Sequence, residues 1–341
     1  MNFYTLTFKK KIILAFSLVI FNLIILDIGL YFLAKNKTTK ITFIDDKFSK
    51  IKHFQLNNSE NKDIVFIGSS RTYYHISTNT FKQNGLDIYN FGVSGDQYED
   101  YPTLIPYVNE SKPKNIVISL SVNRLFDKLY VGNYPTLDEM KNYYSVDKIK
   151  FLSSINTWIV NRHLFLQYSE SIYNKIKSVY QKFEPHNKKY NTQNKTNMQS
   201  DINYTQITKC NYFDRKDLDN GNISFRCENG DGILIGNNIT NKTAKKKYFQ
   251  KFNRQSIVYL QGIIDAIDTE QIKVLLVLEP ILHNQYTYNL DKIKKKFKNI
   301  EIIDLTNYKI EDKYWADDTH INNKGKEIYS QHLMTHLKKK L

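Results

Sequence analysis

The stretch Asp63-Ile-Val-Phe-Ile-Gly-Ser-Ser-Arg71 decides the fold. Residues 64–67 form an unbroken apolar run that stops at a glycine, a pattern typical of a buried strand in a parallel sheet. Open α/β sheets bind their ligands just beyond the carboxyl ends of the strands. A serine pair after Gly68 therefore indicates a nucleophile. The alternative is that Gly68-Ser69-Ser70 is only a turn between a strand and a helix.

Other apolar runs repeat this pattern along the 341-residue chain. We predict further strands at residues 86–91, 115–120, 272–278 and 300–304, and helices at residues 98–110 and 244–267. Strands that alternate with helices imply parallel βαβ units and a three-layer α/β/α sandwich.

The N-terminal segment predicts a membrane anchor. Three lysines at positions 9–11 precede residues 12–34, which are apolar apart from Asp27 and a few small or polar residues. About 23 residues at ~1.5 Å each reach roughly 34 Å, which spans a bilayer core of about 30 Å. A cleavage site after Ala34 would place Phe32 at position −3, where signal peptidase needs a small residue. This favours an uncleaved helix over the alternative, a cleaved signal peptide on a secreted protein.

These features predict the following order of segments. We expect a cytoplasmic N-terminus at residues 1–11, a transmembrane helix at 12–34, a stalk at 35–60 that gains structure near the domain, and an extracytoplasmic domain (periplasm or cell surface) at 61–341.

An insertion at about residues 130–243 interrupts the predicted sheet. Residues 140–182 predict helices, whereas residues 183–243 are rich in Asn, Lys, Thr and Gly. Their low apolar density favours an insertion or lid over an independent core. Cys210 and Cys227 lie here, and they form either a disulfide, which an oxidising compartment allows, or two free buried thiols.

The charge balance is strongly basic. Lys and Arg outnumber Asp and Glu by 49 to 34, a formal net charge of +15. The lysines are scattered among Asn and Ile, and no nucleic-acid-binding motif is present, so we expect no nucleic-acid partner. Compositional drift is one explanation of the surplus, and attraction to anionic lipid or an anionic glycan is the other.

A candidate base for the serine lies some 250 residues downstream. Asp317 and His320 stand in the segment Trp315-Ala-Asp-Asp-Thr-His-Ile-Asn-Asn-Lys-Gly325. An Asp three residues before a His can accept the imidazole Nδ1–H, which leaves Nε2 free to take a proton from a serine hydroxyl. A serine needs such a base, because its own hydroxyl is a poor nucleophile. The alternative is that Asp317-Asp318 only caps the last helix.

Donors for a developing oxyanion can come from two neighbouring strand ends. The backbone N–H of Gly95 and the side-chain amide of Asn123 each follow a predicted strand. Taken singly, Gly95 is equally well explained as a turn glycine and Asn123 as a loop cap. No metal-ligand spacing is present.

Four blocks together resemble the SGNH (GDSL-like) hydrolase superfamily. Its Gly-Asp-Ser block corresponds to Gly68-Ser69-Ser70, its Asn-x-Gly-x-Ser-Gly block to Asn90-Phe-Gly-Val-Ser-Gly95, its Gly-x-Asn-Asp block to Ser121-Val-Asn-Arg124 and its Asp-x-x-His block to Asp317-Asp-Thr-His320. The third block departs from the family, because Ser121 and Arg124 stand in place of its Gly and Asp. The resemblance covers residues 62–126 and 272–335.

The resemblance implies a flavodoxin-like, five-stranded parallel sheet (the SGNH hydrolase fold). It makes Ser70, rather than Ser69, the nucleophile, with His320 as general base oriented by Asp317. It implies an oxyanion hole formed by the backbone N–H groups of Ser70 and Gly95 and by the Asn123 amide, and no metal or other cofactor.

The Gly-Ser-Ser-Arg form of the first block, the single N-terminal helix and the long insertion resemble a narrower group. These are bacterial envelope proteins related to the D-alanyl transfer protein of teichoic acid synthesis and to exopolysaccharide acetylation proteins. The likeness implies a membrane-anchored esterase or O-acyltransferase for acyl, chiefly acetyl, esters of a cell-envelope polysaccharide, working beside a membrane-bound acyl-transfer partner. The alternative is a non-catalytic glycan-binding or scaffold protein of an envelope assembly complex.

Overall fold

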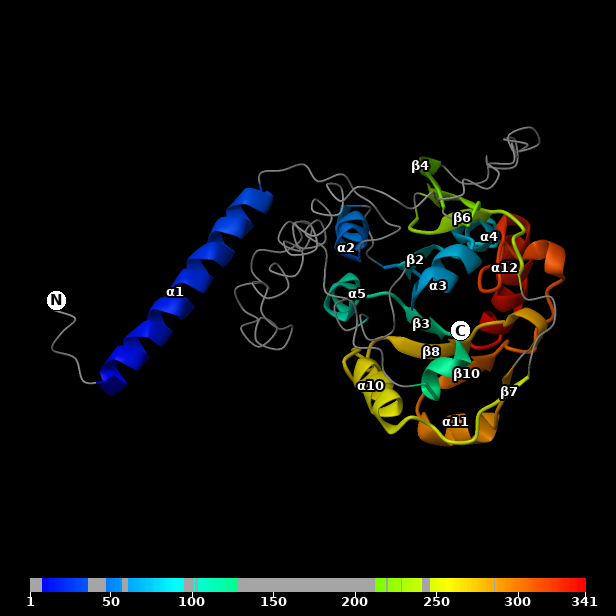
Figure 1. The fold of residues 1–341 in the computed structure, drawn as a ribbon. Coiled ribbons are helices and arrows are strands. Elements are labelled where there is room, and N and C mark those ends of the chain that lie inside the picture. Colours follow the sequence, from blue (N-terminus) through cyan, green and yellow to red (C-terminus); the bar gives the residue numbers. More distant parts are fainter. Residues whose placement is uncertain are drawn as a thin grey trace, which may run out of the picture. The chain divides into compact units, whose positions relative to one another are not determined.

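The computed structural model describes residues 8–35, 47–56, 61–94, 101, 104–127, 212–218, 220–227, 229–240, 246–284 and 286–341. The chain divides into two compact units, one of Met1–Lys40 with Asn133–Ser200 and one of Ile41–Gly132 with Asp201–Leu341. In the first unit the described element is the helix α1 (Phe8–Lys35). The second unit holds the elements described below, and we call it the main body (Figure 1).

Five strands of the described chain form a parallel sheet in the main body, which we call the main sheet. They are β1 (Ile64–Gly68), β2 (Ile88–Gly92), β3 (Asn115–Leu120), β8 (Lys273–Leu278) and β10 (Glu301–Asp304). Their order is β10-β8-β3-β1-β2, and every neighbouring pair is parallel. The predicted α/β class with a parallel sheet is therefore confirmed. Because the chain reverses its direction across the sheet after β2, the carboxyl ends of β1 and β3 flank the switch point where such sheets bind ligands.

Three strands of the main sheet are buried along their whole length. Every residue of β1, β2 and β3 is buried, and Ile67 pairs with Phe91 of β2 on one side and Ile118 of β3 on the other. Ile64 and Phe66 join the core cluster on one face, and the alternate residues of β1 face the opposite side. Unbroken apolar runs are what doubly covered strands require.

Helices cover both faces of the main sheet. The contacts of α3 (Ser70–His75) and α4 (Thr78–Gln83) with α12 (Asn323–Leu337) place these three on one face, and α5 (Ile105–Ser111) and α10 (Arg254–Asp265) lie on the other (Figure 1). The helix predicted from residue 244 begins at Arg254 instead. Asn253 caps it by accepting a hydrogen bond from the Ser256 backbone N–H at 3.2 Å, which stops the helix from extending further toward the N-terminus.

A second sheet arises within the predicted insertion. β4 (Tyr212–Asp217), β5 (Ile223–Cys227) and β6 (Gly232–Ile235) pair in the order β4-β5-β6, and both pairings are antiparallel. These strands were not expected from the sequence, because the surrounding residues 183–243 are rich in Asn, Lys, Thr and Gly. The helices predicted at residues 140–182 lie outside the described residues.

The second sheet packs closely on α3 and α12. A Cβ added at Gly232 would lie 2.2 Å from Cε1 of Tyr73, so only glycine lets the strand approach that ring. Asp231, in the turn before β6, accepts a hydrogen bond from the Thr78 hydroxyl at 2.7 Å and pairs with Lys326 of α12. The side chains of Asp231 and Lys326 are 3% and 4% exposed. A buried charge must be paired in this way, because isolated it would be strongly destabilising.

The end of the predicted stalk contains α2 (Lys47–Leu56). Ile51 and Phe54, three residues apart on one helix face, are buried. The Phe54 ring lies 4.7 Å from that of Tyr89 and 4.9 Å from that of Phe91, both on β2. This helix is therefore part of the main body.

For the predicted membrane helix the structure offers no support. No helix in the described part of the chain meets both the length and the apolar character needed to cross a membrane.

Short elements complete the main body. They are η3 (Val122–Leu125), η5 (Leu282–Asn284), α11 (Leu290–Lys296), η6 (Asp312–Tyr314) and the parallel pair β7 (Lys247–Tyr248) and β9 (Tyr286–Thr287).

Candidate active site

Ser70 stands just past the carboxyl end of β1, as the first residue of α3. Ser69 caps this helix, since its Oγ accepts a hydrogen bond from the Arg71 backbone N–H at 3.4 Å. The chain turns tightly at Gly68, where a Cβ would lie 1.8 Å from the Thr72 Oγ1. Ser70 is half-buried, and its backbone N–H belongs to the first helical turn, where N–H groups have no partner within the helix. Both of its polar groups are therefore suited to meeting a substrate.

Asp317 and His320 share one short loop between η6 and α12. The loop is closed by an antiparallel bridge between Trp315 and Ile321. Asp317 Oδ1 accepts hydrogen bonds from the backbone N–H groups of His320 at 2.8 Å and Thr319 at 2.9 Å. The carboxylate thus shapes the loop that carries the imidazole.

The last helix has its own cap. Asn322 Oδ1 accepts hydrogen bonds from the backbone N–H groups of Lys324 and Gly325, at 3.2 and 3.1 Å. Asp318 instead accepts a hydrogen bond from the Thr240 backbone N–H at 2.9 Å. The alternative in which the Asp317-Asp318 pair caps the helix is therefore wrong.

Ser70, His320 and Asp317 form one hydrogen-bonded chain. The Ser70 hydroxyl lies 2.9 Å from His320 Nε2, and His320 Nδ1 lies 3.0 and 3.1 Å from the two oxygens of Asp317. With Nδ1–H donating to the carboxylate, Nε2 carries the lone pair that faces the hydroxyl. The partner of the imidazole is Ser70 and not Ser69, as the resemblance implied.

The environment keeps Asp317 ionised. Burial by itself would raise the pKa of this carboxyl group, but the hydrogen bond and charge of His320 and the two hydrogen bonds from Thr319 outweigh it. The net effect holds the pKa well below its usual range. A permanent negative charge at this position favours the imidazolium that forms when His320 takes a proton.

Two asparagines of the second sheet complete the surroundings of Asp317. The side-chain amides of Asn220 and Asn222, in the turn between β4 and β5, donate to Asp317 Oδ2 at 3.4 and 3.3 Å. Asn238 donates to Asn222 Oδ1 at 2.7 Å and holds that amide in its donating orientation. No pattern in the sequence predicts these contacts, because they join residues about 95 positions apart through side chains that are common in loops.

Aromatic rings border the imidazole. The Tyr74 ring meets that of His320 edge-on, with centroids 5.5 Å apart and planes at 80°. The Tyr74 hydroxyl lies 3.0 Å from the Ser224 hydroxyl of β5. His75 is fully buried, and its Nε2 accepts a hydrogen bond from the Ile321 backbone N–H at 3.1 Å. Burial lowers the pKa of His75, assisted by the charges of Arg71 and His320, so we assign it a structural role.

Of the two predicted oxyanion donors from neighbouring strand ends, the structure describes Asn123 but not Gly95. Asn123 lies in η3, just past the carboxyl end of β3, the strand next to β1. It shares the sheet edge with Ser70, and its amide donates to Asp127 Oδ2 at 2.8 Å. Gly95 lies outside the described residues.

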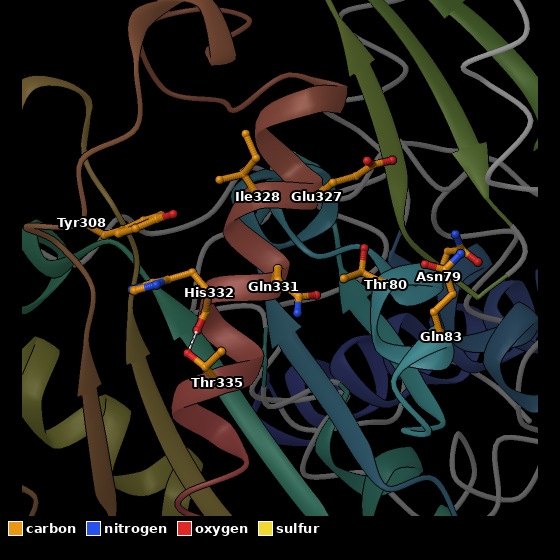
Figure 2. A pocket seen from close by; sticks show the side chains of 9 residues that line it. All are labelled: Asn79, Thr80, Gln83, Tyr308, Glu327, Ile328, Gln331, His332 and Thr335. Carbon is orange, nitrogen blue, oxygen red and sulfur yellow. Dashed lines mark hydrogen bonds between the residues drawn. The ribbon is translucent and has the colours of Figure 1, made fainter.

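A groove of about 610 Å³ runs between α4 and α12, away from this constellation (Figure 2). Asn79 and Thr80 line it from α4, Gln331 and His332 from α12, and Tyr308 from the facing loop. Its described lining includes none of the residues Ser70, Asp317 and His320. The groove therefore does not mark the candidate active site.

Further site predictions concern metals and cysteines. In the portion of the chain that the structure describes, no cluster of His, Cys, Asp and Glu is arranged to hold a metal ion. Cys227 is buried at the end of β5 and is disulfide-bonded, so it is not a free thiol. Its predicted partner, Cys210, lies outside the described residues. Comparison with protein-family models and with curated proteins finds no match.

Proposed function

We propose that this protein is an SGNH-type serine esterase or O-acyltransferase that acts on acyl esters, chiefly acetyl esters, of a cell-envelope polysaccharide. The observation that carries the proposal is the chain of hydrogen bonds from Ser70 Oγ through His320 to Asp317, at 2.9 and 3.0 Å. A second support is its place, since Ser70 lies past β1 at the switch point of the main sheet.

The first half-reaction transfers the acyl group to the serine. His320 Nε2 takes the Ser70 proton as Oγ attacks the ester carbon, and the carbonyl π electrons move to the oxygen. We assign the stabilisation of this oxyanion to the backbone N–H groups of Ser70 and Gly95 and to the Asn123 amide. The imidazolium then returns its proton to the leaving alcohol as the C–O bond breaks, which leaves an acyl-enzyme on Ser70.

The second half-reaction decides between the two activities. His320 takes a proton from the second nucleophile as it attacks the acyl carbon, and the imidazolium then gives that proton to Ser70 Oγ as the acyl C–O bond to Ser70 breaks. Water as nucleophile gives an esterase, and a glycan hydroxyl gives a transferase. Exclusion of water from the acyl-enzyme separates the two.

The proposal includes an extracytoplasmic location, attachment through the N-terminal segment and a membrane-bound acyl-transfer partner. The sequence of residues 12–34 supports the attachment. In α1 the apolar side chains of Ile13, Phe16 and Val19 are more than half exposed. A periplasmic reporter fused after Leu341 should be active, and activity of a cytoplasmic reporter alone would contradict this location.

A fluorophosphonate probe tests the catalytic assignment. The activated serine attacks phosphorus and expels fluoride, so the wild-type protein should become labelled at Ser70. Ser70→Ala should abolish labelling, whereas Ser69→Ala should retain it, because Ser69 is a helix cap whose loss costs about 0.5–2 kcal/mol of stability.

The outcomes separate the proposal from its rival. Absence of labelling in folded wild-type protein would favour the non-catalytic glycan-binding or scaffold protein. Loss of labelling in Ser69→Ala but not in Ser70→Ala would shift the nucleophile by one residue. If labelling occurs as expected, release of acetate from purified envelope glycan, with Ser70→Ala as control, tests the substrate class.

A further inference from the structure

Arg71, the residue after the candidate nucleophile, connects three strand ends of the main sheet. Its Nη1 donates to the Ser121 hydroxyl past β3 at 3.3 Å, and its Nη2 donates to the Pro280 carbonyl past β8 at 2.5 Å. Its Nε lies 3.2 Å from Glu279 Oε2. The side chain is only 13% exposed, so the guanidinium is held in one place beside Ser70.

Glu279 holds the Arg71 guanidinium in place through their ion pair. This carboxyl group is fully buried, and its Oε1 accepts hydrogen bonds from the Thr72 hydroxyl at 3.1 Å and the Ser119 hydroxyl at 2.8 Å. A buried acid is tolerated when a cation and hydrogen-bond donors surround it. Arg71 and the two hydroxyl groups supply these conditions here.

A directional relay leads from Arg71 to Asn123. A guanidinium can only donate, so the Ser121 Oγ accepts from Arg71 and gives its single proton to Asn123 Oδ1, 2.6 Å away. The Asn123 carboxamide is thereby turned with its oxygen toward Ser121 and its NH₂ group away. Asp127 Oδ2 takes one of the two N–H groups at 2.8 Å. Within the described residues no acceptor takes the other.

We propose that Arg71 and Ser121 are positioning residues that keep the Asn123 amide oriented as an oxyanion donor. This rests on the proposed function, and it deepens the role of the same site. When Ser70 Oγ bonds to the ester carbon, the carbonyl oxygen gains the electron pair and the remaining Asn123 N–H donates to it. A carboxamide turned the other way would present its oxygen and repel that charge, and Ser121 adds to the hydrogen bond with Asp127 in opposing that turn.

The test compares single and double substitutions, with hydrolysis of p-nitrophenyl acetate as the readout. Asn123→Ala should lower kcat by about 10²- to 10³-fold, as expected for the loss of one oxyanion donor. Ser121→Ala should lower kcat by about tenfold with little change in KM. In the Asn123→Ala background, Ser121→Ala should have no further effect, because the amide on which it acts is gone.

Three variants control for a merely structural effect. Ser121→Thr keeps the hydroxyl and should restore kcat, and Arg71→Lys, which keeps the charge but loses the fork of N–H groups, should match Ser121→Ala. Thr335→Ala removes a hydroxyl that donates to the His332 carbonyl far from the relay, and kcat should not change. Thermal unfolding identifies any variant that fails to fold.

The outcomes keep the two proposals apart. An unchanged kcat in Ser121→Ala, or independent losses that multiply in the double variant, would overturn the relay while leaving the enzyme intact. If the wild type neither hydrolyses the ester nor reacts with the fluorophosphonate, the proposed function itself fails. If Ser121→Ala does not fold, the kcat of Arg71→Lys and its double variant with Asn123→Ala decide by the same comparison.

Discussion

The main sheet and the second sheet both support the candidate active site, but by different physical means. The main sheet positions Ser70, Asn123 and Glu279 at the ends of buried strands whose backbones are paired on both sides. The second sheet supplies amides to Asp317 from a turn. The candidate nucleophile, Ser70, thus depends on the core of the fold, whereas Asp317, the proposed orienting acid, depends on a polar insertion docked against that core.

The comparison teaches that an insertion of low apolar content can form part of the candidate active site. Two contacts attach the second sheet to the helices of the main sheet. One is the hydrogen bond between the hydroxyl groups of Tyr74 and Ser224, and the other is the buried ion pair of Lys326 and Asp231. These contacts hold the turn with Asn220 and Asn222 against Asp317. An insertion that only covered the site as a lid would not need hydrogen bonds to the Asp317 carboxylate.

The largest effect should follow from changing Asp317, which contacts both His320 and the β4–β5 turn of the second sheet. Asp317→Asn should lower the rate of ester hydrolysis by about 10³- to 10⁴-fold, because a neutral amide favours the wrong tautomer of His320. Asp318→Asn removes the same charge one residue away, beside Thr240, and should change the rate by less than about threefold. Equal losses in both variants would show that loop structure, and not the acid, matters.

The next largest effect concerns stability. Leu275→Ala, at a fully buried position of β8, should destabilise the protein by about 3–4 kcal/mol, because it leaves a cavity in the core. Ile233→Ala, in β6 at 7% exposure, should cost about 1–2 kcal/mol. Urea unfolding measures both. A larger loss for Ile233→Ala would show that the second sheet is the more strongly packed region.

A smaller effect should follow from removing one of the two side-chain amides that donate hydrogen bonds from the second sheet to Asp317. Asn222→Ala should lower kcat about tenfold, since a hydrogen bond to a charged group contributes about 1.5 kcal/mol. Asn237→Ala, which removes an exposed amide that donates to the Asp312 carbonyl at 3.4 Å, is the matched control and should leave kcat unchanged. If Asn222→Ala also leaves kcat unchanged, the second sheet does not contribute to orienting Asp317.

The smallest effect tests an electrostatic link between α2 and the second sheet. Burial, and then the charges of Lys50 and of Arg226 in β5, lower the pKa of His53 from 6.5 to about 3. In the folded protein His53 therefore stays neutral, while in the unfolded chain it gains a proton below pH 6.5. Stability is then lost as the pH falls from 6.5 toward about 3, with a slope of at most about 1.4 kcal/mol per pH unit.

His53→Gln should flatten this part of the stability profile, measured by urea unfolding between pH 7 and pH 5. At pH 7 the variant loses the contact of His53 with the Tyr89 hydroxyl, 2.9 Å away, so only the slope is compared. An unchanged slope would mean that other groups cause the loss of stability in acid.

The sequence alone determined the main sheet and three residues of the candidate site. Runs such as residues 64–67 and 116–118 predict strands because burial on both faces favours apolar side chains at successive positions. The spacing of Asp317 and His320 predicts their contact because both lie in one loop. The rule that the carboxyl ends of parallel strands carry the site points to the serine pair after residue 68, and the family resemblance selects Ser70 from that pair.

Only the tertiary structure decided what surrounds those residues. The second sheet, the amides of Asn220 and Asn222 and the relay from Arg71 to Asn123 join segments far apart in the chain. Polar side chains in loops have many alternative partners, so their sequence carries no period from which a partner can be read. Apolar periodicity reports local burial, whereas a hydrogen bond between distant side chains exists only after the fold has brought donor and acceptor together.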